Sequence, residues 1–176
     1  MNKLTLRRLV LAALFAALTC AATAALHIPS PIGGYFNLGD AVILIGAFLL
    51  TPVWAAVAGG VGAALADVLL GFALYAPATF VIKFLTALTA AFLLRTQKKR
   101  PLLGAALGAV AGELVMAAGY FFYEWALYGL AGGTEGLLTT NLPQAAVSAA
   151  VAILLFFVLD RAHVTGQFGG GISHEG

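Results

Sequence analysis

The sequence predicts an all-α integral membrane protein with six transmembrane helices and both termini in the cytoplasm. Three observations carry this prediction. Of 176 residues, 62% are hydrophobic and only 9% are charged; the apolar residues fall into six segments; and the basic residues gather on one side of the resulting map. A soluble domain normally carries about 25% charged residues. A chain this apolar therefore needs a lipid bilayer around it.

Six apolar segments, bounded by proline, glycine and charge, are the expected helices: 4–26, 38–50, 53–71, 78–94, 102–130 and 142–159. At about 20 apolar residues per span, this length has room for six. The second segment is short, roughly 20 Å at 1.5 Å per residue, and it either spans with little tilt or merges with the third. We expect one domain over 1–162 and a flexible, glycine-rich cytoplasmic tail over 163–176.

The first segment also resembles a secretory signal peptide, because basic residues precede it and the small residues Ala22-Thr23-Ala24 end it. Its apolar run is long for a signal peptide, and more membrane protein follows. We therefore expect the first segment to remain as a helix.

The basic residues orient the chain. Eight of them fall on one side of the map: Lys3, Arg7, Arg8, Arg95, Lys98, Lys99, Arg100 and Arg161. By the positive-inside rule this side is cytoplasmic. The outward loops, 27–37, 72–77 and 131–141, contain no Lys or Arg, so Lys83 is the one basic residue left within a span. The net charge of +2 gives no reason to expect a nucleic acid partner.

Polar residues within the spans concentrate in the outer half. An ionisable side chain in a bilayer costs several kcal/mol, so it usually faces a partner, a bundle interior or a water-filled cavity. On 102–130, Glu113, Tyr120 and Glu124 share one helical face, with Glu113 nearest mid-membrane. The outer group comprises Asp40, Asp67, Lys83, Glu124, Asn141 and Gln144.

We expect these residues to line an outward-opening cavity in which Lys83 is neutralised by Asp67 or Glu124. Small-molecule cavities combine apolar and aromatic walls with a few polar groups. The expected aromatic walls are Tyr35, Tyr75, Tyr120, Phe121, Tyr123 and Trp125. Alternatively, the polar groups only tie helices together, as an Asp67 and Lys83 ion pair or with Asn141 as a helix N-cap. Their concentration in one leaflet favours a binding site, which would also include Asn37.

The chemistry of the sequence disfavours an enzyme, a metal site or a bound cofactor. The single cysteine, Cys20, excludes a disulfide or thiolate metal site within one chain. The spans contain no histidine, and neither an HExxH nor a GxSxG motif occurs. No GxxxxGK[ST] phosphate loop occurs either, so ATP-driven steps would need other subunits.

Small residues form stripes on two expected helices. The first helix carries Ala-x-x-x-Ala in two registers, Ala12 with Ala16 and Ala13 with Ala17, and the third is rich in glycine and alanine over 58–66. Such stripes allow close helix contact. We expect the third helix to pack within the chain, and the first to use one face internally and another for a partner protein.

The runs GYFNLGDA at 34–41, GGVGAALAD at 59–67 and YAPATFVIK at 75–83 together resemble the substrate-binding S components of energy-coupling factor (ECF) vitamin transporters. The resemblance implies an S-component-like bundle in a prokaryotic plasma membrane that binds a water-soluble vitamin or precursor. It also implies a partner transmembrane coupling protein bound to two ATPases. By position, Ala13 and Ala17, or the neighbouring Ala12 and Ala16, would dock, and the first outward loop with Tyr35 and Asn37 would be the lid.

The run GYFNLGD looks most like S components for small aromatic heterocycles, such as the hydroxymethylpyrimidine of thiamine or pyridoxine. Riboflavin and a queuosine precursor stay open as alternatives. A second class is a stand-alone secondary transporter in which Glu113, Asp67 and Lys83 relay protons. The sequence shows no inverted repeat of the kind many such transporters have.

Overall fold

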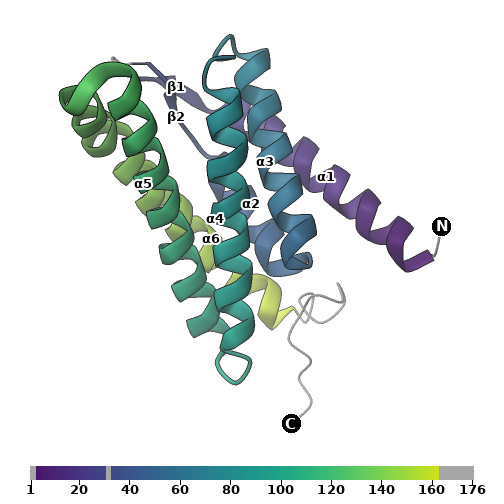
Figure 1. Cartoon of the computed structure of the whole chain (residues 1–176). Coiled ribbons are helices and arrows are strands. Elements are labelled where there is room, and N and C mark those ends of the chain that lie inside the picture. Colours follow the sequence, from purple (N-terminus) through teal and green to yellow (C-terminus); the bar gives the residue numbers. More distant parts are fainter. Residues whose placement is uncertain (1–2, 31–32, 163–176) are drawn as a thin grey trace.

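The computed structural model describes residues 3–30 and 33–162, which form a helical bundle with one short β-hairpin (Figure 1). The expected helical class is confirmed, whereas the expected flexible tail, 163–176, lies outside the described residues. The elements are α1 (Lys3–Ala25), β1 (His27–Pro29), β2 (Tyr35–Asn37), α2 (Gly39–Leu49), α3 (Pro52–Leu69), α4 (Ala76–Thr96), α5 (Pro101–Gly136), the π-helix η1 (Leu137–Asn141) and α6 (Leu142–Arg161).

Four helical stretches are long and apolar enough to cross a membrane: Leu4–Ala25, Pro52–Leu69, Ala76–Thr96 and Pro101–Arg161. The last contains α5, η1 and α6, which pack against each other as the chain folds back (Figure 1). The loop expected at 131–141 is therefore helical, and Gly129, at φ 76°, interrupts α5 shortly before it. Helix α2 is a shorter apolar helix, so six membrane-spanning helices and two cytoplasmic termini remain predictions.

The short helix α2 lies inside the bundle. Nine of its 11 residues are buried, and it packs on α1, α3, α4 and α6. A helix end leaves carbonyl groups without partners. Here Arg95 satisfies two of them, because its Nη1 donates to Ala47 O at 3.3 Å and its Nη2 donates to Leu50 O at 2.5 Å. The enclosed position of α2 explains why it is nearly uniformly apolar apart from Asp40.

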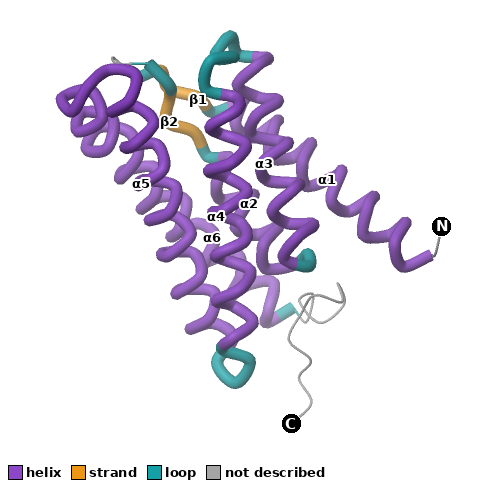
Figure 2. Tube along the Cα trace, viewed as in Figure 1, coloured by secondary structure: helices purple, strands orange, loops and turns teal. Residues whose placement is uncertain are grey.

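Two short paired strands lie within the loop expected at 27–37. β1 and β2 are antiparallel, with His27 opposite Asn37 and Pro29 opposite Tyr35. Gly33 and Gly34 have φ of 108° and 69°, a backbone region that glycine enters without steric cost. Figure 2 shows the hairpin at one end of the bundle, the end at which α2 begins.

Glycines bring the helix backbones together. A Cβ at Gly62 of α3 would lie 2.4 Å from the Ala16 carbonyl oxygen of α1, so the small residues of α3 do pack within the chain. A second stripe, Gly104, Gly108 and Gly112, had not been expected, and it places α5 against α4. At its centre, a Cβ on Gly108 would lie 2.6 Å from the Ala90 carbonyl oxygen. The four-residue spacing puts all three glycines on one face of α5.

Gly108→Val is expected to lower the free energy of unfolding by about 1–3 kcal/mol, the usual cost of overpacking. The new side chain would meet backbone atoms, which cannot rotate away as a flexible side chain can. Thermal unfolding in detergent, followed by circular dichroism, measures the change. Ala118→Val is the matched control, because residue 118 is exposed on the same helix. Equal unfolding temperatures for the two variants would contradict the close α4–α5 contact.

Candidate substrate-binding site

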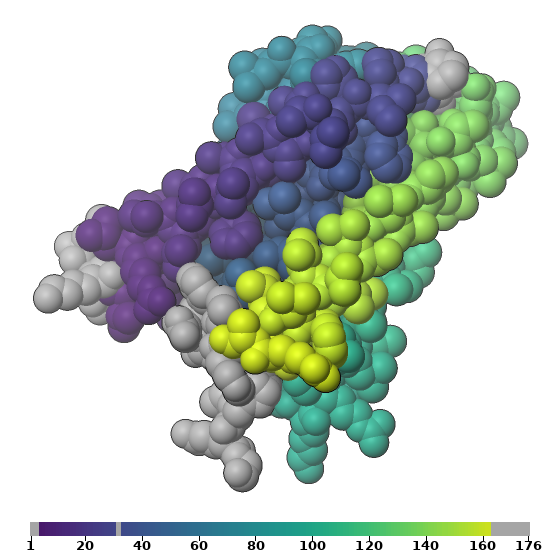
Figure 3. All heavy atoms as spheres, turned by 180° about the vertical axis from the view of Figure 1, so that it is seen from behind, coloured from purple at the N-terminus to yellow at the C-terminus, as the bar shows by residue number. Residues whose placement is uncertain are grey.

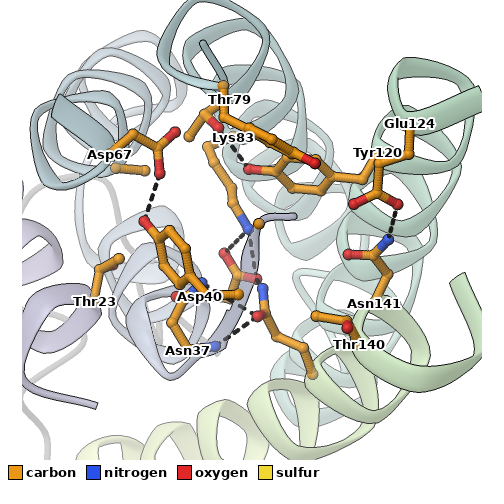
Figure 4. A pocket seen from close by; sticks show the side chains of 15 residues that line it. Thr23, Asn37, Asp40, Asp67, Thr79, Lys83, Tyr120, Glu124, Thr140 and Asn141 are labelled. Carbon is orange, nitrogen blue, oxygen red and sulfur yellow. Dashed lines mark hydrogen bonds and ion pairs between the residues drawn. The ribbon is translucent and has the colours of Figure 1, made fainter. Parts of the chain in front are cut away.

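A polar cavity lies beneath the hairpin, enclosed by side chains from α1 to α6 (Figure 4). The structure brings most of the expected site residues together there. Its lining includes Tyr35, Asn37, Asp40, Asp67, Tyr75, Lys83, Tyr120, Glu124, Asn141 and Gln144. The free space is only about 20 Å³, little more than one water molecule needs. A ring-sized ligand therefore requires side chains or the hairpin to move.

At the floor of the cavity Lys83 forms an ion pair with Asp40. The Lys83 Nζ lies 2.6 Å from Oδ1 and 2.7 Å from Oδ2 of Asp40, and both residues are buried. The expectation that Asp67 or Glu124 neutralises Lys83 is therefore wrong. Asp40 begins α2, which suggested a position near the membrane surface, but α2 begins within the bundle. Lys83 Nζ also lies 5.1 Å from the centroid of the Tyr120 ring.

Gln144 joins this ion pair to the hairpin. Its Nε2 donates to Asp40 Oδ2 at 2.6 Å, and its Oε1 accepts hydrogen bonds from the Asn37 backbone N–H at 2.7 Å and from Asn37 Nδ2 at 3.2 Å. The Asn37 side chain in turn accepts from the Gly39 N–H at 2.9 Å. One hydrogen-bonded network thus connects β2, α2, α4 and α6. Movement of the hairpin would break its outer part.

Tyr35 makes the second contact between hairpin and bundle. Its hydroxyl donates to Asp67 Oδ1 at 2.5 Å, and its ring packs on Phe72 with centroids 4.8 Å apart. Burial raises the pKa of the Tyr35 phenol well above its ordinary value, and the hydrogen bond to Asp67 and the charge of that residue raise it further. The hydroxyl therefore stays protonated and remains a donor.

Tyr35→Phe is expected to lower the free energy of unfolding by about 1.5–3 kcal/mol, because hydrogen bonds to charged groups contribute that much. Tyr123→Phe is the matched control: its hydroxyl donates to the backbone oxygen of Leu74 at 2.6 Å in an exposed position, and about 1 kcal/mol is expected there. Chemical denaturation of both variants in detergent makes the comparison. A smaller loss for Tyr35→Phe than for Tyr123→Phe would contradict the role assigned to the Asp67 contact.

The aromatic wall is smaller than expected. Tyr35, Tyr75 and Tyr120 line the cavity, whereas Phe121, Tyr123 and Trp125 lie outside its lining. Trp125 is 47% exposed. Burial raises the pKa of Tyr75, whose hydroxyl also donates to that of Tyr128 at 3.5 Å.

Glu124 and Asn141 contact each other directly in the lining of the cavity (Figure 4). The Asn141 Nδ2 donates to Glu124 Oε2 at 3.1 Å. Asn141 stands before α6, but its side chain makes no capping hydrogen bond, so the alternative of an N-cap is wrong. Its amide instead orients the Glu124 carboxylate.

Glu113 is the expected site residue that the structure leaves out of the cavity. It lies seven residues below Tyr120, roughly 10 Å along the helix. It is 2% exposed, and neither carboxylate oxygen has a hydrogen-bond partner among the described residues. It borders a separate apolar cavity of about 190 Å³ between α5 and α6, lined also by Val110, Leu114 and Ala145.

Sequence reasoning missed five lining residues: Thr23, Gly34, Ala63, Thr79 and Thr140. Thr79 lies four residues before Lys83, so helical spacing from Lys83 could have found it. Its hydroxyl and that of Tyr120 are 2.9 Å apart and share a hydrogen bond. Thr23 belongs to α1 and carried no signal beyond its small size. Threonine occurs commonly in membrane helices and does not mark a site by itself.

The alanines of α1 divide between two faces. Ala12 is buried in the core and Ala16 is half-buried against α3, whereas Ala13 and Ala17 are exposed. Figure 3 shows α1 lying across the outside of the bundle. Of the two expected docking registers, the structure leaves Ala13 and Ala17 accessible and uses Ala12 and Ala16 for internal packing.

The arrangement is suited to binding. It combines hydrogen-bonding amides, hydroxyls, carboxylates and an ion pair with tyrosine rings around an enclosed space. Over residues 3–30 and 33–162, no group of three or more His, Cys, Asp or Glu side chains is placed to hold a metal ion.

Comparisons with known proteins agree with this architecture. A family model described as the S component of the ECF-type riboflavin transporter matches residues 3–161. An uncharacterised protein of Pyrococcus woesei, from the gap 3' region, is 34% identical over 142 residues, covering 79% of this chain and 92% of that protein. The solved S component of a bacterial ECF transporter superposes with a TM-score of 0.66 at 21% identity, covering 89% of this chain and 97% of that one.

Proposed function

Because the chain belongs to the family of ECF-type riboflavin transporter S components, and is thus a substrate-binding subunit, we propose that it captures a water-soluble vitamin or precursor in the cavity beneath the hairpin. The observation that carries the proposal is the cavity itself, in which polar side chains from six helices and the hairpin converge within an apolar bundle. Structural polar contacts alone give no reason for this convergence.

The hairpin end of the bundle faces outward in this proposal. The turn between α4 and α5, with Lys98, Lys99 and Arg100, lies at the opposite end (Figure 1). The positive-inside rule places that basic end in the cytoplasm. The cavity then opens outward when the Tyr35 and Asn37 contacts of the hairpin release, and the hairpin acts as the lid. The membrane is the plasma membrane of a prokaryote.

The substrate that suits the cavity is a small aromatic heterocycle, such as hydroxymethylpyrimidine or pyridoxine. Tyr35 and Tyr120 supply ring faces, and the Asn141 and Gln144 amides supply donors and acceptors. The family model names riboflavin, and riboflavin and a queuosine precursor are the competing ligands.

Transport requires partners in this proposal. The subunit docks through Ala13 and Ala17 of α1 on a transmembrane coupling protein, which is bound to two ATPases. Family membership favours this arrangement over a stand-alone secondary transporter. Lys83 also binds Asp40 rather than Glu113 or Asp67, the two groups with which it would relay protons in a secondary transporter.

The direct test is to purify the full chain, identify any small molecule that accompanies it, and screen riboflavin and other B vitamins by thermal shift. A ligand that binds the folded state raises its unfolding temperature. Co-purification with a coupling protein and ATPases from the native membrane tests the partners. The absence of both a vitamin ligand and these partners would contradict the proposed function.

A further inference from the structure

The charges that line the cavity do not balance. Among the described lining residues Lys83 is the only cation, and both oxygens of Asp40 already bind its Nζ. Asp67 and Glu124 also line the cavity, and their hydrogen bonds come from the neutral groups of Tyr35 and Asn141. A neutral pair and two further carboxylates remain. With both of these carboxylates ionised, the excess charge of the cavity is negative.

One oxygen of each of these two carboxylates accepts no hydrogen bond from the described residues. Tyr35 binds Oδ1 of Asp67, whereas Oδ2 is buried without a hydrogen-bond partner, in a residue that is 3% exposed. Asn141 binds Oε2 of Glu124, and Oε1 accepts no hydrogen bond from the described residues. Figure 4 shows Asp67 and Glu124 on opposite sides of the cavity, with Tyr120 between them.

A buried carboxylate without a cation is costly, because it loses its hydration and gains too little in return. A ligand that brings a positive charge and N–H donors offsets that cost through charge-assisted hydrogen bonds. An anionic ligand adds like-charge repulsion. The cavity therefore discriminates by charge as well as by shape, with tyrosine faces for a ring and carboxylates for a cation.

Resting on the transport function above, we propose that the cavity selects a small aromatic ring that carries a protonated amine. The ammonium group donates to Asp67 Oδ2, and further N–H groups of the ring face Glu124 Oε1. Lys83 keeps its partner Asp40 throughout, so it does not recruit an anion. This assigns Asp67 and Glu124 as the residues that determine ligand charge.

Two matched ligand series test the proposal on the full chain in detergent. The first is pyridoxamine, pyridoxine and pyridoxic acid, which share one ring and carry an aminomethyl, a hydroxymethyl and a carboxylate group. The second series is 2-methylpyrimidin-4-amine that carries an aminomethyl, a hydroxymethyl or a carboxylate group. In the series whose ring fits, the amine is expected to bind roughly tenfold more tightly than the alcohol. No binding of the carboxylate is expected.

Three variants locate the preference. Asp67→Asn and Glu124→Gln should each reduce the ratio of amine to alcohol affinity, and the double variant should bring it close to one. Glu135→Gln is the control, because it removes a carboxylate that is exposed on the same stretch of helix and lies outside the cavity. Unfolding temperatures without ligand show whether the variants fold. The ligand series on the wild-type protein tests the charge preference even if a variant does not fold.

The outcomes are distinguishable. Binding of riboflavin or of an uncharged ring with no preference for the amine would overturn the charge inference and leave the transport function standing. An unchanged amine preference in the double variant would overturn the assignment to Asp67 and Glu124. Failure of the transport function appears separately, as the absence of any vitamin ligand and of the coupling partners.

Discussion

Lys83→Met is expected to lower the free energy of unfolding by about 3–5 kcal/mol, the usual loss when one partner of a buried ion pair is removed. Asp40 is 0% exposed, and among the described residues only the Gln144 amide would still donate a side-chain hydrogen bond to its carboxylate. Its carboxylate would then remain charged and desolvated in the centre of the bundle. Thermal and denaturant unfolding in detergent measure the loss, and ligand binding should disappear with it.

The double variant Lys83→Met/Asp40→Asn separates charge from packing. It removes the carboxylate that the single change leaves behind, so most of the lost stability should return, because a buried pair stabilises little relative to neutral replacements. Lys98→Met is the control, since residue 98 is exposed in the turn between α4 and α5. The ion pair would lose its assigned role if Lys83→Met unfolded at the same temperature as this control.

Most residues that line the cavity could be predicted from the sequence, because polar residues stand out within an apolar span. Asp67, Lys83 and Gln144 would each be unremarkable in a soluble helix, but within a span they must face the interior or a cavity. The starts of two helices could also be predicted, because proline is common at the beginning of a helix. Helices α3 and α4 begin at Pro52 and Ala76, each at or next to a proline. The features that depend only on residue type and on depth in the membrane could therefore be predicted from the sequence.

The partner of each charged side chain could not be predicted from the sequence, because it depends on how the helices pack. Asp40 looked peripheral at the start of a short helix, yet neighbouring helices and the hairpin enclose it. Glu113 shares a helical face with Tyr120 and Glu124, but a shared face does not mean a shared cavity when two turns separate them. The strands of the hairpin are three residues each, too short for an alternating pattern to be recognised.

The two alanine registers on α1 differ in burial. Sequence spacing permits either register as a docking surface, because both give Ala-x-x-x-Ala. Ala12 lies at 4% exposure within the core, while Ala13 and Ala17 are exposed beside Val10 and Leu14. Small residues among larger exposed ones form a shallow groove in which a partner helix can approach closely. Burial of one register thus leaves the other, Ala13 and Ala17, as the proposed docking surface.

Ala13→Leu and Ala17→Leu are therefore each expected to abolish vitamin uptake by cells while the purified protein still binds its ligand. A leucine would fill the groove and hold the partner helix away, whereas the cavity lies at the hairpin end of the bundle, away from this surface. Uptake of radiolabelled vitamin and thermal shift with the same compound measure the two activities on each variant. Co-purification of the coupling protein should be lost together with uptake.

Ala118→Leu supplies the matched control, because it places the same side chain at an exposed position of α5, away from α1. It should retain both uptake and binding, which separates an effect of the surface from a general effect of added bulk in lipid. Parallel loss of uptake and ligand binding in the α1 variants would indicate misfolding and contradict docking. Retained uptake would show that the exposed alanine register does not contact the coupling protein. The coupling protein would then have to contact another surface of the bundle.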